Sequence, residues 1–364
     1  MDMILREMQA DEAKKIQKLG EITFMRSLEG AFVSKPKTAR VAVKDGNIVG
    51  GLIYKIEQAG RKKLGFIDFF FVDPKYAGKG IGNELCKDAI AHMWAEGCDC
   101  LAVIVRDDNV GSWLAFEKNG FVRADLFKVA GELGVLGFVK TYLKHWYGFC
   151  PGCELFYVSR DKKEAELPDY AKKAGFGQAV LHVFTNIALM LVLILSSVGF
   201  TYFAGDIVPQ LPDILIPLLI IFGGSAVFGF IGTLFSKHDW GYRMTTGGLL
   251  MSAGASIFSG FIPMMGNWYP RKYENTPEFR RDMGITAVLP WLFVMGLAVL
   301  MVFFGEMVGF LGGNQATIIV LLVFRCMPFP MISFGSVRIF RWSKIIYGVM
   351  FASTIALIVS FLLV

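Results

Sequence analysis

Residues 69–86 read FFFVDPKYAGKGIGNELC, and this stretch decides the fold of the N-terminal half of the chain. The aromatic run over 64–72 favours β-structure and predicts a central strand. A helix is predicted over about 80–96, where apolar residues recur every four positions. The loop between them contains Gly78, Gly80 and Gly82. A strand, a glycine-rich loop and a helix therefore follow one another directly.

This order of elements is suited to binding a pyrophosphate. Glycine allows positive φ and a close approach of the backbone to a ligand, and the N–H groups at a helix N-terminus attract anions. A tight turn without a ligand is the alternative interpretation. A Rossmann site is disfavoured because no acidic residue ends a following strand at the required spacing. A P-loop is excluded because no Lys-Ser/Thr pair follows the last glycine.

The neighbouring segments predict an α/β domain around this motif. A helix is expected over 10–28, and a hairpin follows with strands at 40–43 and 48–56. After the glycine loop come a strand at 101–105 and a short helix within 109–121.

Residues 1–160 resemble the GNAT (Gcn5-related) N-acetyltransferases, through FFFVDPKYAGKGIGNELC at 69–86 and NVGSWLAFEKNGF at 109–121. The resemblance implies an α/β GNAT fold, which is a mixed central sheet flanked by helices. It also implies acetyl-CoA as the co-substrate, an amine as the acceptor and no metal. By this resemblance, the residues that would bind acetyl-CoA are Phe71, Val72, Ala77, Gly78, Lys79, Gly80, Ile81, Gly82, Asn109 and Phe116.

The chain departs from the family pattern at three positions. Lys75 stands where Gln or Arg is usual, and Ala77 stands where Arg is common. Backbone amides do most of the phosphate binding, so these changes weaken the site without removing it. Phe116 occupies the position often held by the Tyr that protonates the leaving CoA thiolate, and phenylalanine cannot donate a proton. Water or another hydroxyl must then serve.

Asp68 is the candidate general base. It is the only acid in its apolar strand, and the family's catalytic carboxylate can lie near this point. Burial among Phe66, Phe69 and Phe70 is expected to raise the pKa of this carboxyl toward neutrality, as a base requires. The alternative is a structural Asp that faces solvent or bonds to a loop.

Residues 132–149, ELGVLGFVKTYLKHWYGF, are compatible with a basic, aromatic helix. Three interpretations of such a helix are open: it covers the acceptor site, it lies at the membrane interface, or it packs as an ordinary helix. His145 lies in this segment, and the sequence identifies no acidic partner for it.

The second half of the chain differs sharply in composition. Residues 174–364 contain ten Lys or Arg and seven Asp or Glu, so only 17 of 191 residues are charged. This predicts a multi-pass membrane domain over 174–364, joined by a polar linker at 161–173 to the acetyltransferase-like domain at 1–160. No signal peptide is seen at the N-terminus, so we expect the first domain in the cytoplasm. The net charge of +6 is too small and too dispersed to indicate nucleic acid.

Charge placement predicts about five spans and one re-entrant segment. Residues 245–266 are rich in Gly, Ser and Ala, which disfavours a lipid-facing helix and favours a segment that enters and returns on one side. Lys and Arg then lie on the cytoplasmic side, in agreement with the positive-inside rule. The charge-free runs assigned as spans are 174–205, 214–236, 283–305, 307–324 and 345–364.

Residues 180–360 weakly resemble the membrane core of the site-2 (M50) proteases, through GITAVLPWLF at 284–293 and PFPMISFGSVRIFRW at 328–342. The zinc ligands of that family are missing. GFIGT at 229–233 replaces HExxH, and Met331, Ile332 and Ser333 stand where the aspartate ligand is expected. Zinc catalysis needs three protein ligands, so no metal is expected.

His182 and Asn186 lie four residues apart and share one face of the first predicted span. Polar groups in a span either bond to a neighbouring helix or line a substrate path.

The sequence therefore predicts a membrane-tethered N-acetyltransferase. It would move an acetyl group from acetyl-CoA to an amine of a protein, a lipid headgroup or a small molecule at the cytoplasmic face of the bilayer. The alternative is a non-catalytic CoA-binding module coupled to an inactive protease-like membrane domain.

Overall fold

The computed structural model describes residues 3–24, 33–107, 109–124, 126–161, 175–271, 274, 276–305, 308–311, 313–327 and 335–363. The chain divides into two compact units. The N-terminal unit comprises residues 1–105, 109–147 and 154–170, and the C-terminal unit comprises 106–108, 148–153 and 171–364. The linker predicted at 161–173 lies almost wholly outside the described residues, so the predicted domain boundaries stay a prediction.

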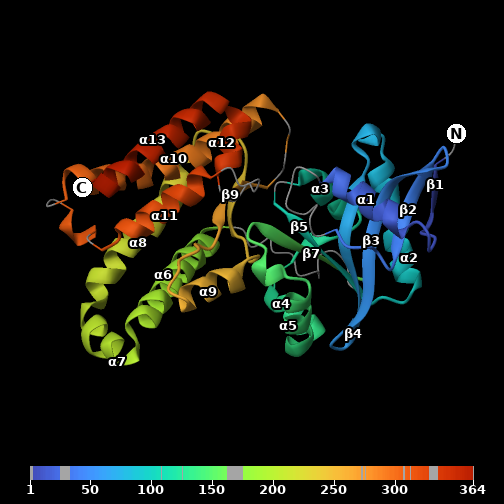
Figure 1. Cartoon of the computed structure of the whole chain (residues 1–364), viewed down its shortest axis with the longest axis horizontal. Coiled ribbons are helices and arrows are strands. Elements are labelled where there is room, and N and C mark those ends of the chain that lie inside the picture. The colour runs from blue at the N-terminus through green and yellow to red at the C-terminus, as the bar shows by residue number, and fades with distance from the viewer. Residues whose placement is uncertain are drawn as a thin grey trace. The chain divides into compact units, whose positions relative to one another are not determined.

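A seven-stranded mixed sheet forms the N-terminal unit, in the order β1-β2-β3-β4-β5-β7-β6 (Figure 1). The strands are β1 (Ile4–Glu7), β2 (Ala39–Lys44), β3 (Asn47–Ala59), β4 (Lys62–Val72), β5 (Cys100–Arg106), β6 (Val122–Arg123) and β7 (Cys153–Ser159). β1 to β4 pair antiparallel, and β4 pairs with β5 in parallel. The predicted mixed α/β sheet is confirmed.

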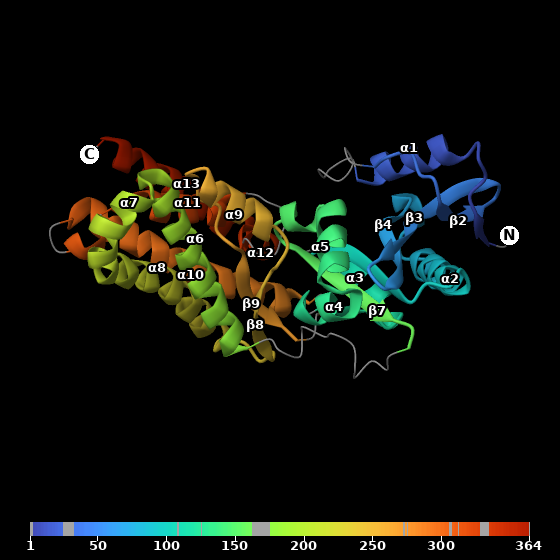
Figure 2. The ribbon, with the colours of Figure 1, turned by 90° about the horizontal axis from the view of Figure 1, so that it is seen from below.

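Helices cover both faces of this sheet. They are α1 (Ala13–Thr23), α2 (Ile81–Ala95), α3 (Val110–Lys118), α4 (Leu126–Leu133) and α5 (Val135–Lys144). Figure 2 shows α1 and α2 on opposite sides of the sheet. On the α1 side Ile16 packs into a cluster with Phe71, and on the α2 side Met93 lies over Gly65. A Cβ added at Gly65 would lie 2.9 Å from the Met93 sulfur, so this position needs glycine for close packing.

A β-bulge interrupts β4 at Asp68. In the ladder with β3, Ile53 pairs with Phe69 and Tyr54 pairs with Ile67, so Asp68 is the extra residue. The parallel pairing of β4 with β5 covers four residues and ends at Ile67 and Val103. Bulges redirect side chains and often lie beside active sites. The predicted base thus occupies an irregular position in an otherwise regular strand.

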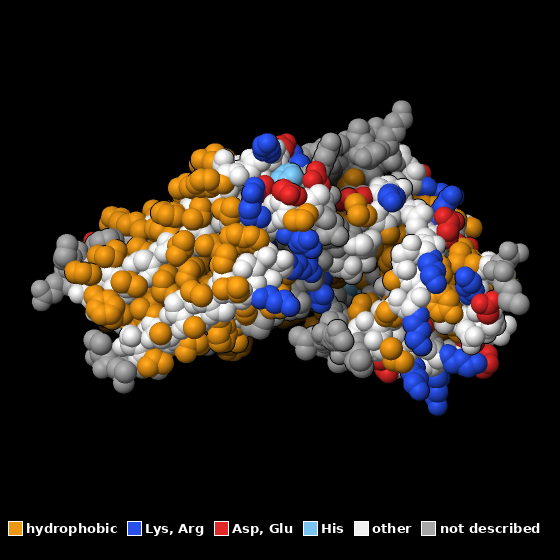
Figure 3. All heavy atoms as spheres, turned by 90° about the horizontal axis from the view of Figure 1, so that it is seen from above, with side chains coloured by type: hydrophobic (Ala, Val, Ile, Leu, Met, Phe, Trp, Pro, Cys, Tyr) orange, Lys and Arg blue, Asp and Glu red, His pale blue; other side chains and the backbone are white. Residues whose placement is uncertain are grey.

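The C-terminal unit is mainly helical. Its elements are α6 (Phe176–Val198), α7 (Phe200–Tyr202), α8 (Leu211–Thr233), β8 (Trp240–Met244), α9 (Leu249–Ile257), β9 (Gly266–Pro270), α10 (Pro277–Phe303), α11 (Gln315–Cys326), α12 (Ser336–Trp342) and α13 (Lys344–Leu363). The core between its helices includes the fully buried Leu218, Val294 and Leu322. Many other apolar side chains of these helices are exposed, including Phe200 and Ile345. Figure 3 shows how hydrophobic side chains cover the visible face of this unit.

Four helices in the described part of the chain are long and apolar enough to cross a membrane, whereas the sequence predicted about five spans. They cover Phe176–Val198, Phe200–Thr233, Pro277–Phe303 and Lys344–Phe361. Within the span expected at 307–324, the described residues form only the shorter helix α11, which begins at Gln315. Gly313, with φ of 81°, lies outside helical geometry just before it. A helix of this length extends about 18 Å, well short of a hydrocarbon core of about 30 Å.

The segment predicted to be re-entrant returns to its starting point. Met244 at the end of β8 pairs with Gly266 at the start of β9, and α9 lies between these two strands. The two ends of the segment are therefore adjacent, as a re-entrant path requires. Its entry into a bilayer stays a prediction.

Candidate active site

The glycine-rich loop has the geometry of an anion cradle. Gly78 and Gly80 have φ of 75° and 80°, and Gly80 caps the N-terminus of α2. A Cβ built at either glycine meets no atom within 4 Å, so the space beside the backbone is open. The first N–H groups of a helix have no partner within the helix and carry its positive partial charge. This loop can accept a phosphate group.

Other residues of the predicted CoA site have packing roles. A Cβ at Gly82 would lie 3.2 Å from the Phe70 ring, so Gly82 lets α2 approach β4. The side chain of Phe71 is buried in the cluster under α1.

The remaining predicted residues lie in or beside the loop. Lys79 extends over the ring of Tyr76, with Nζ 5.1 Å from its centroid. Ala77 is extended, and Ile81 is the first, buried residue of α2. Val72 ends β4 beside this loop.

Asn109 and Phe116 are positioned by α3. Asn109 caps the helix, since its Oδ1 accepts a hydrogen bond from the Ser112 N–H at 3.3 Å. Phe116 is 1% exposed, and its ring centroid lies 5.8 Å from that of Phe70 and 5.2 Å from that of Phe121. The phenylalanine that replaces the family's tyrosine therefore belongs to an aromatic cluster between α3 and β4.

Asp68 is paired with a cation. Lys55 Nζ lies 2.6 Å from its Oδ2, and His145 Nδ1 lies 3.8 Å from its Oδ1. Burial raises the pKa of Asp68, as expected, but the contacts with His145 and Lys55 outweigh burial and hold this pKa below its usual value. The expected upward shift is wrong, because two basic partners from other elements stabilise the carboxylate.

His145 joins α5 to the sheet through two acids. Its Nε2 lies 3.0 Å from Glu57 Oε1, and its ring stacks on Phe66. Its side chain is only 3% exposed. Lys144 forms a second ion pair with Glu57. Burial raises the pKa of Glu57, but Lys144 and His145 lower it below its usual value overall.

The sequence missed this acid–imidazole–acid cluster because its members are distant along the chain. Glu57 and Asp68 belong to β3 and β4, whereas His145 lies at the end of α5. One usable signal was present. Lys55 and Glu57 are two residues apart in a strand, so their side chains share a face. Two charged side chains on one face of a largely buried strand indicate that oppositely charged groups from other elements contact them.

An apolar pocket adjoins His145. Phe66 of β4, whose ring stacks on that of His145, is one of its lining residues. Its other lining residues come from β4, β5, β7, α4, α5 and the turn after α5: Leu64, Ala102, Ile104, Val129, Leu133, Phe138, Thr141, Tyr142, Tyr147, Leu155 and Tyr157. The cluster therefore combines charged groups with an adjacent apolar surface.

No group of three or more His, Cys, Asp or Glu side chains in the described residues is placed to hold a metal ion. Met331, Ile332 and Ser333 lie outside the described residues, as does the start of the motif at 328–342.

Comparison with known proteins finds a family match within the N-terminal unit. Residues 5–121 match the acetyltransferase (GNAT) family. N-alpha-acetyltransferase MAK3 of Arabidopsis thaliana is 29% identical over 89 residues, which are 24% of this chain and 47% of that protein. N-alpha-acetyltransferase 30 of Xenopus laevis is 33% identical over 91 residues, which are 24% of this chain and 33% of that protein. This chain thus spans less than half the length of these curated relatives.

Solved structures include similar chains at lower identity. A GNAT family acetyltransferase from Brucella melitensis, in complex with acetyl-CoA, is 20% identical with a TM-score of 0.29, and the match covers 33% of this chain and 82% of that one. Nothing in the comparisons supports the resemblance of residues 180–360 to the site-2 proteases. The comparisons thus support a GNAT acetyltransferase domain at residues 5–121 of this chain.

Proposed function

We propose that this protein transfers an acetyl group from acetyl-CoA to an amine at the cytoplasmic face of a membrane, in which its C-terminal helices anchor it. The observation that carries the proposal is the loop at the N-terminus of α2. Gly78 and Gly80 adopt left-handed conformations beside open space there. Backbone N–H groups of residues 77–82 would bind the pyrophosphate of CoA.

In the reaction, the acceptor nitrogen attacks the thioester carbonyl carbon. A C–N bond forms, the C–S bond breaks, and the electron pair leaves with the CoA sulfur. The acceptor must first lose a proton from its ammonium form. Asp68, at the β-bulge, is our candidate for the group that receives this proton, although His145 and Lys55 hold its pKa below its usual value. His145 Nδ1 lies 3.8 Å from its carboxylate. Phe116 has no hydroxyl, so water or another hydroxyl protonates the departing thiolate, and the acylated nitrogen loses its second proton to solvent to give the neutral amide.

Lys55 suggests how an acceptor would bind. Its ammonium lies 2.6 Å from Asp68 Oδ2, while its side chain is about half exposed. An incoming ammonium would take the place of this flexible group at the same carboxylate. Exchange of one ammonium for another leaves the largely buried carboxylate paired with a cation.

The apolar pocket beside His145 favours an acceptor whose amine is close to a hydrophobic group. The names of the two relatives specify acetylation of α-amines. Together these observations favour a peptide N-terminus with an apolar first side chain over a lipid headgroup or a polyamine as the acceptor.

Release of the CoA thiol from acetyl-CoA tests the proposal with the full chain in detergent. The acceptors are a peptide with a free N-terminus, the same peptide with a blocked N-terminus, phosphatidylethanolamine and spermidine. Turnover should need the free N-terminus. Gly80→Asp places a carboxylate beside the expected phosphate and should abolish CoA binding by calorimetry. Gly46 has φ of 74° and open space in a hairpin turn, so Gly46→Asp is a matched control.

Wild-type CoA binding that Gly80→Asp leaves unchanged would refute the loop as the binding site. A second candidate function is a non-catalytic CoA-binding module, which the aromatic packing of Phe116 favours. Binding of CoA without turnover on any of these acceptors would support that candidate.

Membrane anchoring is supported by the four long apolar helices. We propose that the N-terminal unit and the loops rich in Lys and Arg lie in the cytoplasm. In this topology the segment over 245–266 enters and returns on the cytoplasmic side, and α11 crosses only part of the bilayer.

A further inference from the structure

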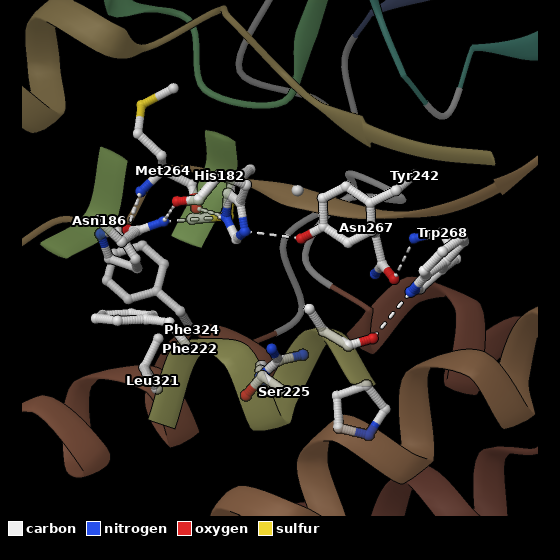
Figure 4. Close-up of a pocket in the computed structure, with 16 residues that line it drawn as sticks. His182, Asn186, Phe222, Ser225, Tyr242, Met264, Asn267, Trp268, Leu321 and Phe324 are labelled. Atoms are coloured by element: carbon white, nitrogen blue, oxygen red, sulfur yellow. Dashed lines mark hydrogen bonds between the residues drawn. The ribbon is translucent and has the colours of Figure 1, made fainter. Parts of the chain in front are cut away.

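The C-terminal unit contains a pocket that the acetyl-transfer proposal does not use (Figure 4). Polar and apolar side chains both line it. Its lining residues come from α6, α8, α10, α11, β8, β9 and the chain before β9. The lining residues include His182, Ser225, Tyr242, Trp268 and Arg325.

One wall of the pocket is a fully bonded polar network. In Figure 4 the Tyr242 hydroxyl points at His182, and it lies 2.7 Å from Nδ1. His182 Nε2 lies 2.8 Å from the Met264 carbonyl oxygen, to which it donates. Asn186 Oδ1 accepts from the Met264 N–H at 2.9 Å. The face shared by His182 and Asn186 therefore fixes the chain before β9, and these residues are structural.

The opposite side carries donors that lack partners. Ser225 on α8 is 7% exposed, and its Oγ is buried without a hydrogen bond to any described residue. Arg325 is in the last turn of α11, and its Nε is likewise buried and unpaired within the described part of the chain. A buried donor without a partner typically costs about 1–3 kcal/mol, and an unpaired buried charge costs more.

The lining residues of this pocket carry positive but no negative charge. Arg325 is their only Lys or Arg, and none of them is Asp or Glu. The rest of the lining is largely apolar and includes Phe222, Leu321 and Phe324. An anion would satisfy the guanidinium and the hydroxyl together, and a hydrocarbon chain would suit the apolar walls.

We propose that this pocket binds an anionic amphiphile, with its carboxylate or phosphate at Arg325 and Ser225 and its acyl chain along the apolar walls. The ligand comes from one of two sources, a free fatty acid or an acidic membrane lipid. The site lies wholly within the C-terminal unit and is independent of the proposed acetyl transfer.

Thermal unfolding of the full chain in detergent tests this site, because a bound ligand raises the unfolding midpoint with its concentration. The probes are oleate and dioleoyl phosphatidate. Oleyl alcohol and dioleoylglycerol are their uncharged counterparts. We expect stabilisation by at least one charged probe and none by the uncharged ones. Stronger binding of oleate identifies a free acid as the source, and stronger binding of phosphatidate identifies a lipid.

Single substitutions test whether Arg325 and Ser225 bind the anionic group of the ligand. Arg325→Gln should raise the half-saturating concentration about tenfold or more, and Ser225→Ala about fivefold. Arg280→Gln removes the same charge from an exposed position on α10 and should leave binding unchanged. Equal stabilisation by charged and uncharged probes overturns the proposal, as does wild-type binding by Arg325→Gln. If Arg325→Gln does not fold, Ser225→Ala and the uncharged probes still decide the result.

Discussion

Lys55 Nζ lies 2.6 Å from Asp68 Oδ2, across the ladder between β3 and β4. The carboxylate that we propose as a proton acceptor is therefore already paired with an ammonium group. This pairing, together with His145, lowers the pKa of Asp68 even though burial alone would raise it. Asp68 stays ionised at neutral pH and can attract a cationic acceptor.

The ion pair predicts a pH effect of Lys55→Met. Removing the ammonium takes away one of the groups that lower the Asp68 pKa, so this pKa should rise. The acid limb of the pH profile of kcat/KM should then move to higher pH. Lys37→Met removes an exposed lysine from a connecting segment and should leave the profile unchanged. Identical profiles for wild type and Lys55→Met would show that Asp68 does not set the acid limb.

Loss of the carboxylate itself should be more severe. Asp68→Asn cannot accept the acceptor's proton, and general-base groups typically contribute about 10²- to 10⁴-fold. We therefore expect kcat to fall by at least about 100-fold, with CoA binding by calorimetry unchanged. A comparable loss of CoA binding would instead indicate a structural role for this residue.

His145 can be tested without removing its stacking on Phe66. His145→Phe keeps an aromatic ring but removes both nitrogens, which leaves Glu57 and Asp68 without the imidazole. We expect a loss of activity of tenfold or more and a changed pH profile, because proton handling is altered. His92→Phe is the control, since His92 contacts Tyr54 by its ring on another element. A lower kcat with an unaltered pH profile would point to a purely structural role for His145.

The free energy of unfolding of the N-terminal unit should fall in acid, because the carboxylate of Glu12 becomes protonated. The hydrogen-bonded Arg6 side chain lowers the pKa of Glu12 to about 2. Its two oxygens lie 2.6 and 2.8 Å from Arg6 nitrogens, and one accepts from the Gln9 N–H. A carboxyl group whose pKa is lower in the folded than in the unfolded protein stabilises the fold. This stabilisation is complete above the pKa of the unfolded state and is lost as the pH falls toward the pKa of the folded state.

Hydrogen exchange of the α1 amides measures this effect. Glu12→Gln should increase exchange at pH 6, and the difference from wild type should shrink between about pH 4.5 and 2. Glu21→Gln alters an exposed carboxylate on the same helix and should change little. A difference that persists at pH 2 would contradict the assignment.

The proposed topology can be checked with cysteine labelling. Asp206→Cys lies in a helical segment between α6 and α8, which the proposed topology puts outside, so it should react with an impermeant maleimide in intact cells. Asn47→Cys, in the β2–β3 hairpin, should react only after permeabilisation. Both are made with Cys150→Ser and Cys153→Ser, because those two native thiols are partly exposed. Labelling of Asn47→Cys in intact cells would reverse the orientation.

Local sequence patterns were sufficient for much of the fold and for part of the site. The aromatic strand, the glycine loop and the helix from Ile81 were all predicted, since each depends on residues close together in the chain. The apolar helices were predicted for the same reason. The described residues contain four long apolar helices where the sequence predicted about five spans, because a charge-free run does not fix where a helix begins, and α11 begins only at Gln315.

By itself, then, the sequence determined a GNAT-like α/β unit followed by a helical, strongly apolar unit, because secondary structure and hydropathy are encoded in short repeats. Only the tertiary structure decided which groups surround Asp68, since Lys55 and Glu57 come from β3 and His145 from the end of α5. For that reason the pKa of Asp68 is lowered, whereas the sequence analysis predicted that it would be raised. Electrostatic environments depend on distances in space, which spacing along the chain does not specify.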